Sequence, residues 1–223
     1  MSGDGREGRS GVCLPLPRIP WLRRILAWFL RHLYGTFAWA YDVVAWWVSF
    51  GRWVAWGEAA LPLLGGGSVL EVGCGTGRLL SRLVERGRAV GCDVSRAMLR
   101  QAHRRLRSRG GPVPLCQARA QALPFPSGAF EAVVSVFPTA YVYDPACWAE
   151  FRRVLKRGGR VVVVHSVQAG RAIPLRLAGA LLEQEEGQKL PAEGFRVSLQ
   201  CVPVGRDRVL VYMAERSDGT DVG

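Results

Sequence analysis

Apolar runs of strand length alternate with amphipathic stretches of helix length through the middle of the chain. The apolar runs lie at 68–72, 89–94, 112–116, 130–137 and 160–166. Stretches with a helical apolar period lie between them, at Arg78–Arg86, Ser95–Arg109 and Pro145–Lys156. Strands that alternate with helices are typical of a parallel sheet that carries helices on both faces. The pattern therefore predicts an α/β fold for this region.

The two flanks of this region follow different patterns. Near the end of the chain, residues 195–204 and 208–216 are two strand-like runs joined only by Gly205-Arg206-Asp207, which predicts an antiparallel hairpin. Before the region, residues 21–64 are aromatic and helical in pattern and hold seven of the eight tryptophans. We expect this segment to be a helical cap on an α/β domain at 65–216.

The remaining residues, at 1–20 and 217–223, are expected to be flexible tails. Within the cap, the segment 21–34 places its arginines along one side of a helix and apolar side chains over most of the rest. Such a helix either packs over the sheet or lies in a membrane interface, where tryptophan and arginine are both favoured. Both alternatives stay open at the level of sequence.

The charge of the chain changes this picture little. The formal net charge is +12, but among the 30 basic residues only Lys156 and Lys189 are lysines. An arginine bias of this kind often reflects genome composition, so we do not take it as evidence for a nucleic-acid partner. It fits attraction to an anionic membrane surface equally well.

The cysteines and histidines indicate the compartment and argue against a metal. The six cysteines lie singly, with no CxxC pair, and there are only three histidines. This predicts small buried thiols in a reducing cytoplasm and no metal site. Neither a signal-peptide pattern nor a long uncharged apolar run occurs. We therefore expect a cytoplasmic protein, with peripheral contact to the inner membrane surface if 21–34 binds lipid.

The first apolar run ends in a glycine-rich stretch that carries the candidate chemistry. Gly73, Gly75 and Gly77 alternate directly after the strand, so a ligand can approach the backbone closely. The spacing is GxGxG, which is weaker than a dinucleotide fingerprint, and no Gly-Lys-Ser/Thr follows. Glu71 lies on the strand itself, and Asp93 ends the second strand. Two acids beside the loop repel a pyrophosphate and favour a ligand with a ribose and a positive charge, such as S-adenosylmethionine.

Four motifs in succession resemble a known family. The stretches VLEVGCGTG, AVGCDVSRAML, ALPFPSGAFEAVVS and RRVLKRGGRVVVV are similar to those of class I S-adenosylmethionine-dependent methyltransferases, in particular the menaquinone and ubiquinone C-methyltransferase type. The resemblance implies a Rossmann-like, mainly parallel sheet of about seven strands that ends in the hairpin. It also implies methyl transfer from S-adenosylmethionine to a small acceptor. The aromatic cap suggests a hydrophobic acceptor, like a quinone or a lipid.

The resemblance assigns roles to individual residues. Those implied to contact the cofactor are Glu71, Gly73, Gly75, Gly77, Asp93, Val94, Met98, Ala120, Gln121, Ser135 and Phe137. Glu71 is expected to orient the ammonium group, Asp93 the ribose hydroxyls, and Val94 with Met98 the adenine. Candidates on the acceptor side, taken from their places near strand ends and in the cap, are Tyr41, Tyr141 and His165.

Two alternatives to an enzyme of this family stay open at the level of sequence. Arg119 stands where the family often has an acid that accepts from the adenine amino group, and arginine cannot accept a hydrogen bond. This departure allows a non-catalytic interaction module of the same fold, and the net charge allows an RNA-modifying or RNA-binding protein. Neither the catalytic residues nor the oligomeric state follow from the sequence.

Overall fold

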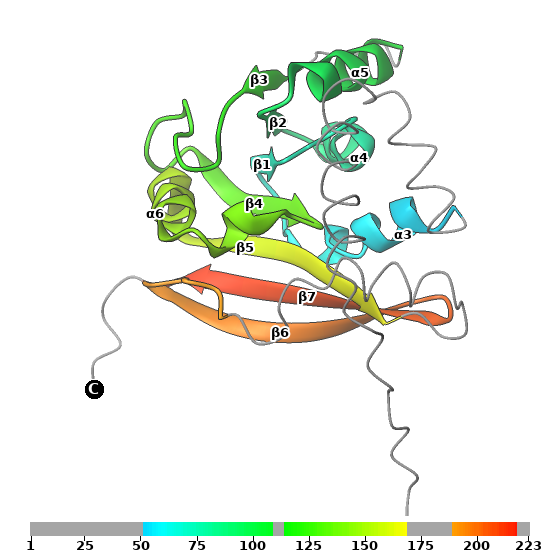
Figure 1. Cartoon of the computed structure of the whole chain (residues 1–223). Helices are drawn as coiled ribbons and strands as arrows, with labels where there is room; N and C mark the ends of the chain where they lie inside the picture. The colour runs from blue at the N-terminus through cyan, green and yellow to red at the C-terminus, as the bar shows by residue number, and fades with distance from the viewer. Residues whose placement is uncertain (1–50, 109–113, 169–188, 218–223) are drawn as a thin grey trace, which may run out of the picture.

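Seven strands form one mixed sheet in the computed structural model of the chain, which describes residues 51–108, 114–168 and 189–217. The sheet order is β3-β2-β1-β4-β5-β7-β6 (Figure 1). The strands are β1 (Val69–Val72), β2 (Ala89–Asp93), β3 (Leu115–Gln117), β4 (Phe130–Val136), β5 (Leu155–Gln168), β6 (Phe195–Val204) and β7 (Asp207–Arg216).

Five strands pair in parallel, and β7 runs opposite to its two neighbours. β1 pairs in parallel with β2 and β4, β2 pairs with β3, and β4 pairs with β5. β7 is antiparallel to both β5 and β6. This confirms the predicted seven-stranded, mainly parallel sheet with a C-terminal hairpin. The hairpin loop is shorter than expected, because Val204 already pairs with Asp207 and only Gly205 and Arg206 lie between the strands.

Helices cover both faces of the sheet. They are α3 (Trp53–Glu58), the short 3-10 helix η1 (Leu61–Leu63), α4 (Arg78–Arg86), α5 (Arg96–Arg107), the 3-10 helix η2 (Ala140–Tyr143) and α6 (Pro145–Val154). One core cluster joins α3, α4 and α5 to one face, and a second joins α6 to the other (Figure 1). Fully buried valines of β4 and β5 contribute to both clusters, as a sheet covered on two sides requires.

Local sequence signals fix the helix starts. Ser95 precedes α5, and its hydroxyl accepts a hydrogen bond from the Met98 amide at 3.3 Å. Asp144 precedes α6, where its carboxylate accepts from the Ala146 amide at 3.0 Å and Pro145 takes the first helical position. Both are N-caps of the usual kind.

The boundary between α6 and β5 differs from the prediction. The helix ends at Val154, and β5 begins at Leu155 rather than at 160. Leu155 pairs with Phe130 on β4, and the register then shifts before Arg160 pairs with Ala132. Residues 156–159 therefore lie within the bounds of β5. The start of β5 depends on its pairing with β4, so the local sequence pattern does not predict it.

Several predictions concern residues outside the described ones: the tail at 1–20, the cap from 21 to 50 with its helix 21–34 and Tyr41, and residues 218–223. The described end of the predicted cap packs against the hairpin. Trp56 is buried, and its indole Nε1 donates to Asp207 Oδ2 at 3.0 Å. Arg52 pairs with the same oxygen at 2.8 Å. Among the described helices, none has the length and apolar character needed to cross a bilayer.

Candidate active site

The glycine loop lies where the order of the sheet reverses. From β1 the chain builds outward through β2 and β3, then returns to the other side of β1 with β4. Ligands of open α/β sheets bind at such a switch point, beyond the carboxyl ends of the strands. Gly73, Gly75 and Gly77 follow β1 at φ values of 73°, 52° and 74°, in the left-handed region that glycine adopts without strain. The predicted loop is thus built at this point.

Asp93 braces the loop from the end of β2. Its Oδ2 accepts a hydrogen bond from the Gly75 amide at 2.9 Å, and its Oδ1 accepts from the Ser95 amide at 2.8 Å. Each carboxylate oxygen has a second lone pair, so both can still accept from a ligand hydroxyl. Partial burial raises the pKa of Asp93, and the backbone hydrogen bonds oppose that rise. The carboxylate is therefore fixed in place before any ligand arrives.

Glu71 is a buried acid with an unsatisfied oxygen. Its side chain is 3% exposed, and Oε2 has no hydrogen-bond partner. Burial, followed by repulsion from Asp93, raises the pKa of Glu71 well above its usual value. Glu71 lines a pocket together with Trp53, Val54, Gly73, Gly75, Thr76 and Val136. An unpaired buried carboxylate is costly, and a cation in this pocket would relieve that cost.

The glycine at position 75 leaves space that a ligand can use. A Cβ on Gly75 would meet no atom within 4 Å, so the loop itself does not fill this volume. At Gly73 the reason for glycine is different, because a Cβ there would lie 2.7 Å from the Tyr141 hydroxyl. Gly75 therefore lies on the open side of the loop, and Gly73 lies on the side that packs against Tyr141.

Tyr141, expected on the acceptor side, lies beneath the loop. Its hydroxyl donates to the Val72 carbonyl at 3.1 Å and lies 2.6 Å from Ser135 Oγ. Ser135 is fully buried, and its hydroxyl donates to the same Val72 carbonyl at 2.9 Å. Burial raises the pKa of Tyr141, so its phenol stays protonated. Tyr141 and Ser135 together support the end of β1 from below.

At the expected adenine end, the residues divide into exposed and buried ones. Val94 is 65% exposed, which is unusual for a valine and leaves it open to a flat ligand. Met98 is fully buried and Ala120 is 8% exposed. Both side chains therefore support the site from beneath and expose little surface to a ligand. Gln121 directs its side-chain amide to Asp144 at 3.0 Å. The backbone of Gln121, and not its side chain, therefore remains the expected contact with the adenine.

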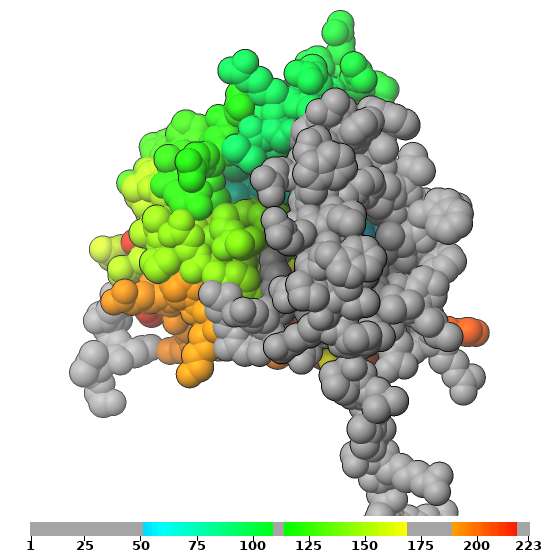
Figure 2. Space-filling view, in the orientation of Figure 1, coloured from blue at the N-terminus to red at the C-terminus, as the bar shows by residue number. Residues whose placement is uncertain are grey.

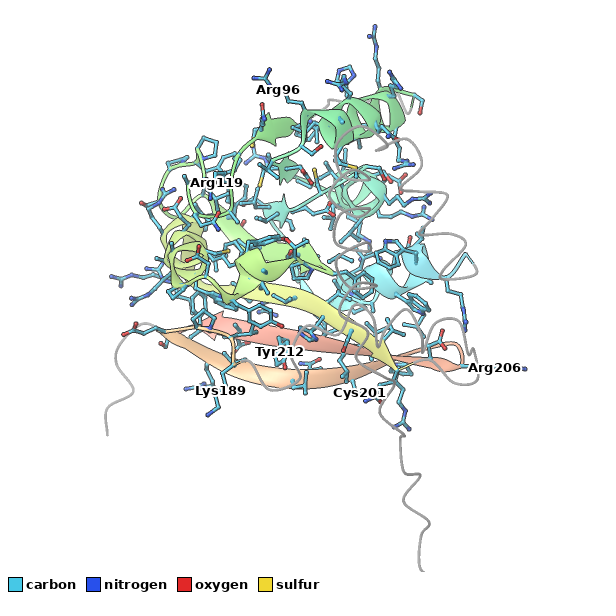
Figure 3. All side chains as sticks on the ribbon, viewed as in Figure 1. Arg96, Arg119, Lys189, Cys201, Arg206 and Tyr212 are labelled. Atoms are coloured by element: carbon cyan, nitrogen blue, oxygen red, sulfur yellow. The ribbon has the colours of Figure 1, made fainter. Side chains whose placement is uncertain are left out.

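Arg119 and Arg96 both lie at this end of the molecule (Figure 3). Arg119 is exposed, and its backbone forms a small bridge with Ala122. Arg96 donates to Gln117, whose amide in turn donates to the Val94 carbonyl at 3.0 Å. Gln117 was not singled out from the sequence. Its position at the end of β3, paired with Asp93, is the signal that could have found it.

At the end of β4, Phe137 has an unusual backbone. It is the one described residue other than glycine with a positive φ, at 47°. Its ring packs on Trp53, with ring centroids 4.5 Å apart. Strain of this kind clusters at functional sites. His165 lies on the neighbouring strand β5, with Nε2 2.8 Å from the Tyr143 hydroxyl.

Comparison with known proteins agrees with this geometry. Residues 69–159 match the family model described as a methyltransferase domain. The matched segment begins at β1 and includes the glycine loop, Asp93, Ser135 and Phe137. This match identifies residues 69–159 as a methyltransferase domain.

Relatives of the methyltransferase domain include C-methyltransferases. The chain is 36% identical over 145 residues to the ubiquinone/menaquinone biosynthesis C-methyltransferase UbiE of Escherichia coli O1:K1. That alignment covers 60% of this chain and 58% of the UbiE protein, so the chain spans less than two thirds of this relative.

Solved structures share the fold. The geranyl diphosphate C-methyltransferase of Streptomyces coelicolor A3(2) matches with a TM-score of 0.58 at 19% identity, over 73% of this chain and 78% of that one. The PH0226 protein of Pyrococcus horikoshii OT3 matches with a TM-score of 0.54 at 22% identity, over 70% of this chain and 88% of that one. At these identities the likeness concerns the fold.

The methyltransferase domain contains one loop contact that the sequence did not suggest. Arg105 on α5 donates to the hydroxyl of Thr76 at 2.8 Å and also to the Thr76 carbonyl. In the structure it holds the glycine loop from the side of the helix. Within the described residues, no group of His, Cys, Asp and Glu side chains is arranged to hold a metal ion.

Proposed function

We propose that this chain is an S-adenosylmethionine-dependent methyltransferase that methylates a small hydrophobic acceptor of the quinol class. The observation that carries the proposal is the unpaired Glu71 carboxylate oxygen beside the left-handed glycine loop. A dinucleotide would bring a pyrophosphate to this loop and meet repulsion from Glu71 and Asp93. S-adenosylmethionine has an ammonium and a sulfonium group instead, so its charge complements the site.

The residues of the site fit separate parts of this cofactor. Glu71 would hold the ammonium group, and the backbone at Gly75 would lie against the methionine chain, where a Cβ meets open space. Asp93 would accept from the ribose hydroxyls with the lone pairs that its backbone contacts leave. The exposed Val94 would cover the adenine. The bound cofactor supplies a methyl group on a sulfonium, which is a good leaving group.

The work left to the protein is alignment and the exclusion of water. Orienting two reactants can lower a barrier by about 7–11 kcal/mol in favourable cases. The strained end of β4, with Phe137 packed on Trp53, offers an aromatic wall where the methyl group is expected. This wall supports a hydrophobic acceptor. The name of the E. coli relative, a ubiquinone/menaquinone C-methyltransferase, supports methyl transfer to carbon of a reduced quinone.

Two measurements test the proposal in order. Calorimetry with S-adenosylhomocysteine and S-adenosylmethionine tests the cofactor site, with Asp93→Ala as the variant expected to bind more weakly. A methyl-transfer assay with tritiated S-adenosylmethionine on a lipid and quinone extract then tests the acceptor class. Binding without transfer to any extracted lipid would favour the non-catalytic module. Absence of binding would contradict the proposal as a whole.

The contacts of α5 count against an RNA-binding protein of the same fold. The side chains of α5 project at one end of the molecule (Figure 2). Arg105 is engaged with Thr76, and Arg96 with Gln117. Two of the arginines that contribute to the net charge behind this alternative therefore support the cofactor end of the domain. Salt-sensitive RNA binding that is lost in Arg104→Ala would be needed to revive it.

A further inference from the structure

A polar pair lies at the carboxyl edge of the sheet, outside the cofactor contacts described above. His165 belongs to β5, and Tyr143 is the last residue of η2. The Tyr143 hydroxyl oxygen lies 2.8 Å from His165 Nε2, and the two rings meet edge to face. Both side chains are half-buried, so part of each remains accessible.

His165 is held out of the regular strand ladder. On β7, Val211 and Leu210 are consecutive, but they pair with Val164 and Ser166 of β5. His165 is therefore the extra residue of a bulge. Bulges re-aim a side chain and are over-represented beside active sites. Tyr212 of β7, labelled in Figure 3, supports the imidazole. The centroids of the two rings lie 5.3 Å apart, and the rings meet at 89°.

The bulge lies beside the end of β4 that faces the cofactor site. Val136 lines the pocket of Glu71 and pairs with Val164 across the two strands. The next amide, that of Phe137, donates to the Val164 carbonyl at 2.8 Å. His165 thus follows directly after the last paired residue, about one strand spacing of 4.8 Å from β4.

η2 gives a second link between the histidine and the loop. Tyr141, near the start of this short helix, supports Gly73 and the end of β1. Tyr143, two residues later, meets His165. A single 3-10 turn therefore fixes the relative positions of the glycine loop and the imidazole.

The contacts leave one ring nitrogen for an acceptor. Nε2 faces the Tyr143 oxygen, whereas Nδ1 receives no hydrogen bond from the part of the chain that the structure describes. In the tautomer with the proton on Nε2, that N–H donates to Tyr143 and Nδ1 keeps its lone pair. Burial lowers the pKa of His165, which favours the neutral imidazole around pH 7.

We infer that His165 is the general base that activates a hydroxyaromatic acceptor through Nδ1, and that Tyr143 is the positioning residue that accepts the hydrogen bond of Nε2–H. The inference rests on the proposed function and adds to it a named base and an acceptor hydroxyl. A base that is oriented by a third group in this way can activate its partner.

The step balances without a further reactant. His165 Nδ1 takes the proton of the acceptor hydroxyl, and the electron pair of that O–H bond moves into the ring. A ring carbon forms a bond to the methyl group while the methyl–sulfur bond breaks and leaves its pair on sulfur. The ring carbon then loses its own proton to solvent, and the oxygen regains a proton from His165. One proton is released in each cycle.

Binding of two naphthalenes tests the inference without relying on turnover. Calorimetry in the presence of S-adenosylhomocysteine compares 1-naphthol with 1-methoxynaphthalene, which lacks the hydroxyl proton. We expect the protein to prefer 1-naphthol by about tenfold, because a site built to accept a hydrogen bond rejects the analogue without it. His165→Gln and Tyr143→Phe should reduce that preference. His103→Gln, on the exposed side of α5, is the matched control and should not.

Nitrogen NMR supplies a readout that a merely structural role would not change. In the unaltered protein, Nε2 of His165 should be protonated and Nδ1 should be unprotonated. In Tyr143→Phe both tautomers should appear, while the affinity for S-adenosylhomocysteine is kept. Equal binding of the two naphthalenes, binding of neither, or full preference in His165→Gln would overturn the inference and leave the cofactor site intact. Absence of S-adenosylhomocysteine binding by the unaltered protein would overturn the proposed function, and the inference with it.

Discussion

The backbone amide of Gly75 donates a hydrogen bond to Asp93 Oδ2 across 2.9 Å, which ties the glycine loop to the end of the neighbouring strand. Asp93 therefore has two tasks. It shapes the loop through Gly75 and Ser95, and it presents its remaining lone pairs toward the proposed ribose. The same carboxylate that would recognise the ligand also keeps the site open for it.

Replacing Asp93 should weaken cofactor binding and loosen the loop together. Asp93→Ala removes an acceptor of two backbone amides and of the proposed ribose hydroxyls. We expect a loss of about 1.5–3 kcal/mol in the free energy of S-adenosylmethionine binding, as for hydrogen bonds to a charged group. Calorimetry measures it. An unchanged affinity would remove the main support for placing the cofactor here.

Substitution of Gly75 should lower the affinity for the cofactor far more than it lowers the stability of the fold. Gly75→Ala would cost about 1–2 kcal/mol of stability, because alanine is strained at a positive φ. Its methyl group would also occupy the space proposed for the ligand, so affinity should fall by more than the strain explains. Gly128→Ala is the matched control, since Gly128 has a φ of 68° and equally open surroundings but lies outside the site. Similar losses of stability with equal cofactor affinity in both variants would show that the loop is merely a turn.

Gly73 and Tyr141 should be energetically coupled. A Cβ at position 73 would lie 2.7 Å from the Tyr141 hydroxyl and 3.6 Å from the ring carbon that bears it. Tyr141→Phe removes the close atom, so the double variant should be less destabilised than the two single variants predict. We expect a coupling of about 0.5–2 kcal/mol in the free energy of unfolding, measured by urea denaturation of all four proteins. Simple additivity would mean that the loop moves away from the tyrosine.

The ionised Glu71 side chain should destabilise the ligand-free protein. Because its pKa in the folded protein is raised, the folded state binds more protons than the unfolded state. Its contribution to stability therefore declines as the pH rises above the ordinary glutamate pKa of 4.5 and through the raised value. Glu71→Gln should remove this decline and raise the melting temperature of the ligand-free protein at neutral pH.

The same substitution should weaken binding of the cationic cofactor by about 1.5–3 kcal/mol, the range for a charged hydrogen bond. Thermal melts across pH, with and without S-adenosylhomocysteine, measure both effects. A ligand-free variant that melts lower than the unaltered protein at pH 7 and above would contradict the assignment of Glu71 as an unsatisfied acid.

The segment 21–34 gives a prediction that rests on sequence alone, since it lies outside the described residues. Deleting residues 1–34 should abolish sedimentation with anionic liposomes at low salt, because the arginines and apolar side chains of this segment suit a membrane interface. Cofactor affinity should persist, as Asp93 and the glycine loop lie elsewhere. Full-length protein that stays in the supernatant would contradict membrane contact. Loss of solubility on deletion would favour a helix packed on the domain.

The sequence by itself determined the sheet, the loop and the acids around it. Strand-length apolar runs, helix periods and caps such as Ser95 are local signals, so the order of elements followed from short stretches. Glu71, Gly75 and Asp93 were also found in this way, because a strand, its turn and the end of the next strand are close in sequence. The family resemblance supplied their roles and the number of strands.

Only the tertiary structure decided what supports the site. Tyr141 reaches Val72 across 69 residues, Arg105 reaches Thr76 across 29, and His165 meets Tyr143 across 22. Asp207, expected to be a turn residue, instead is buried against Trp56 across 151 residues. Such contacts depend on strand register, on a bulge and on which helix covers which face. A local pattern cannot report them, because their free energy arises between segments that meet only when the chain is folded.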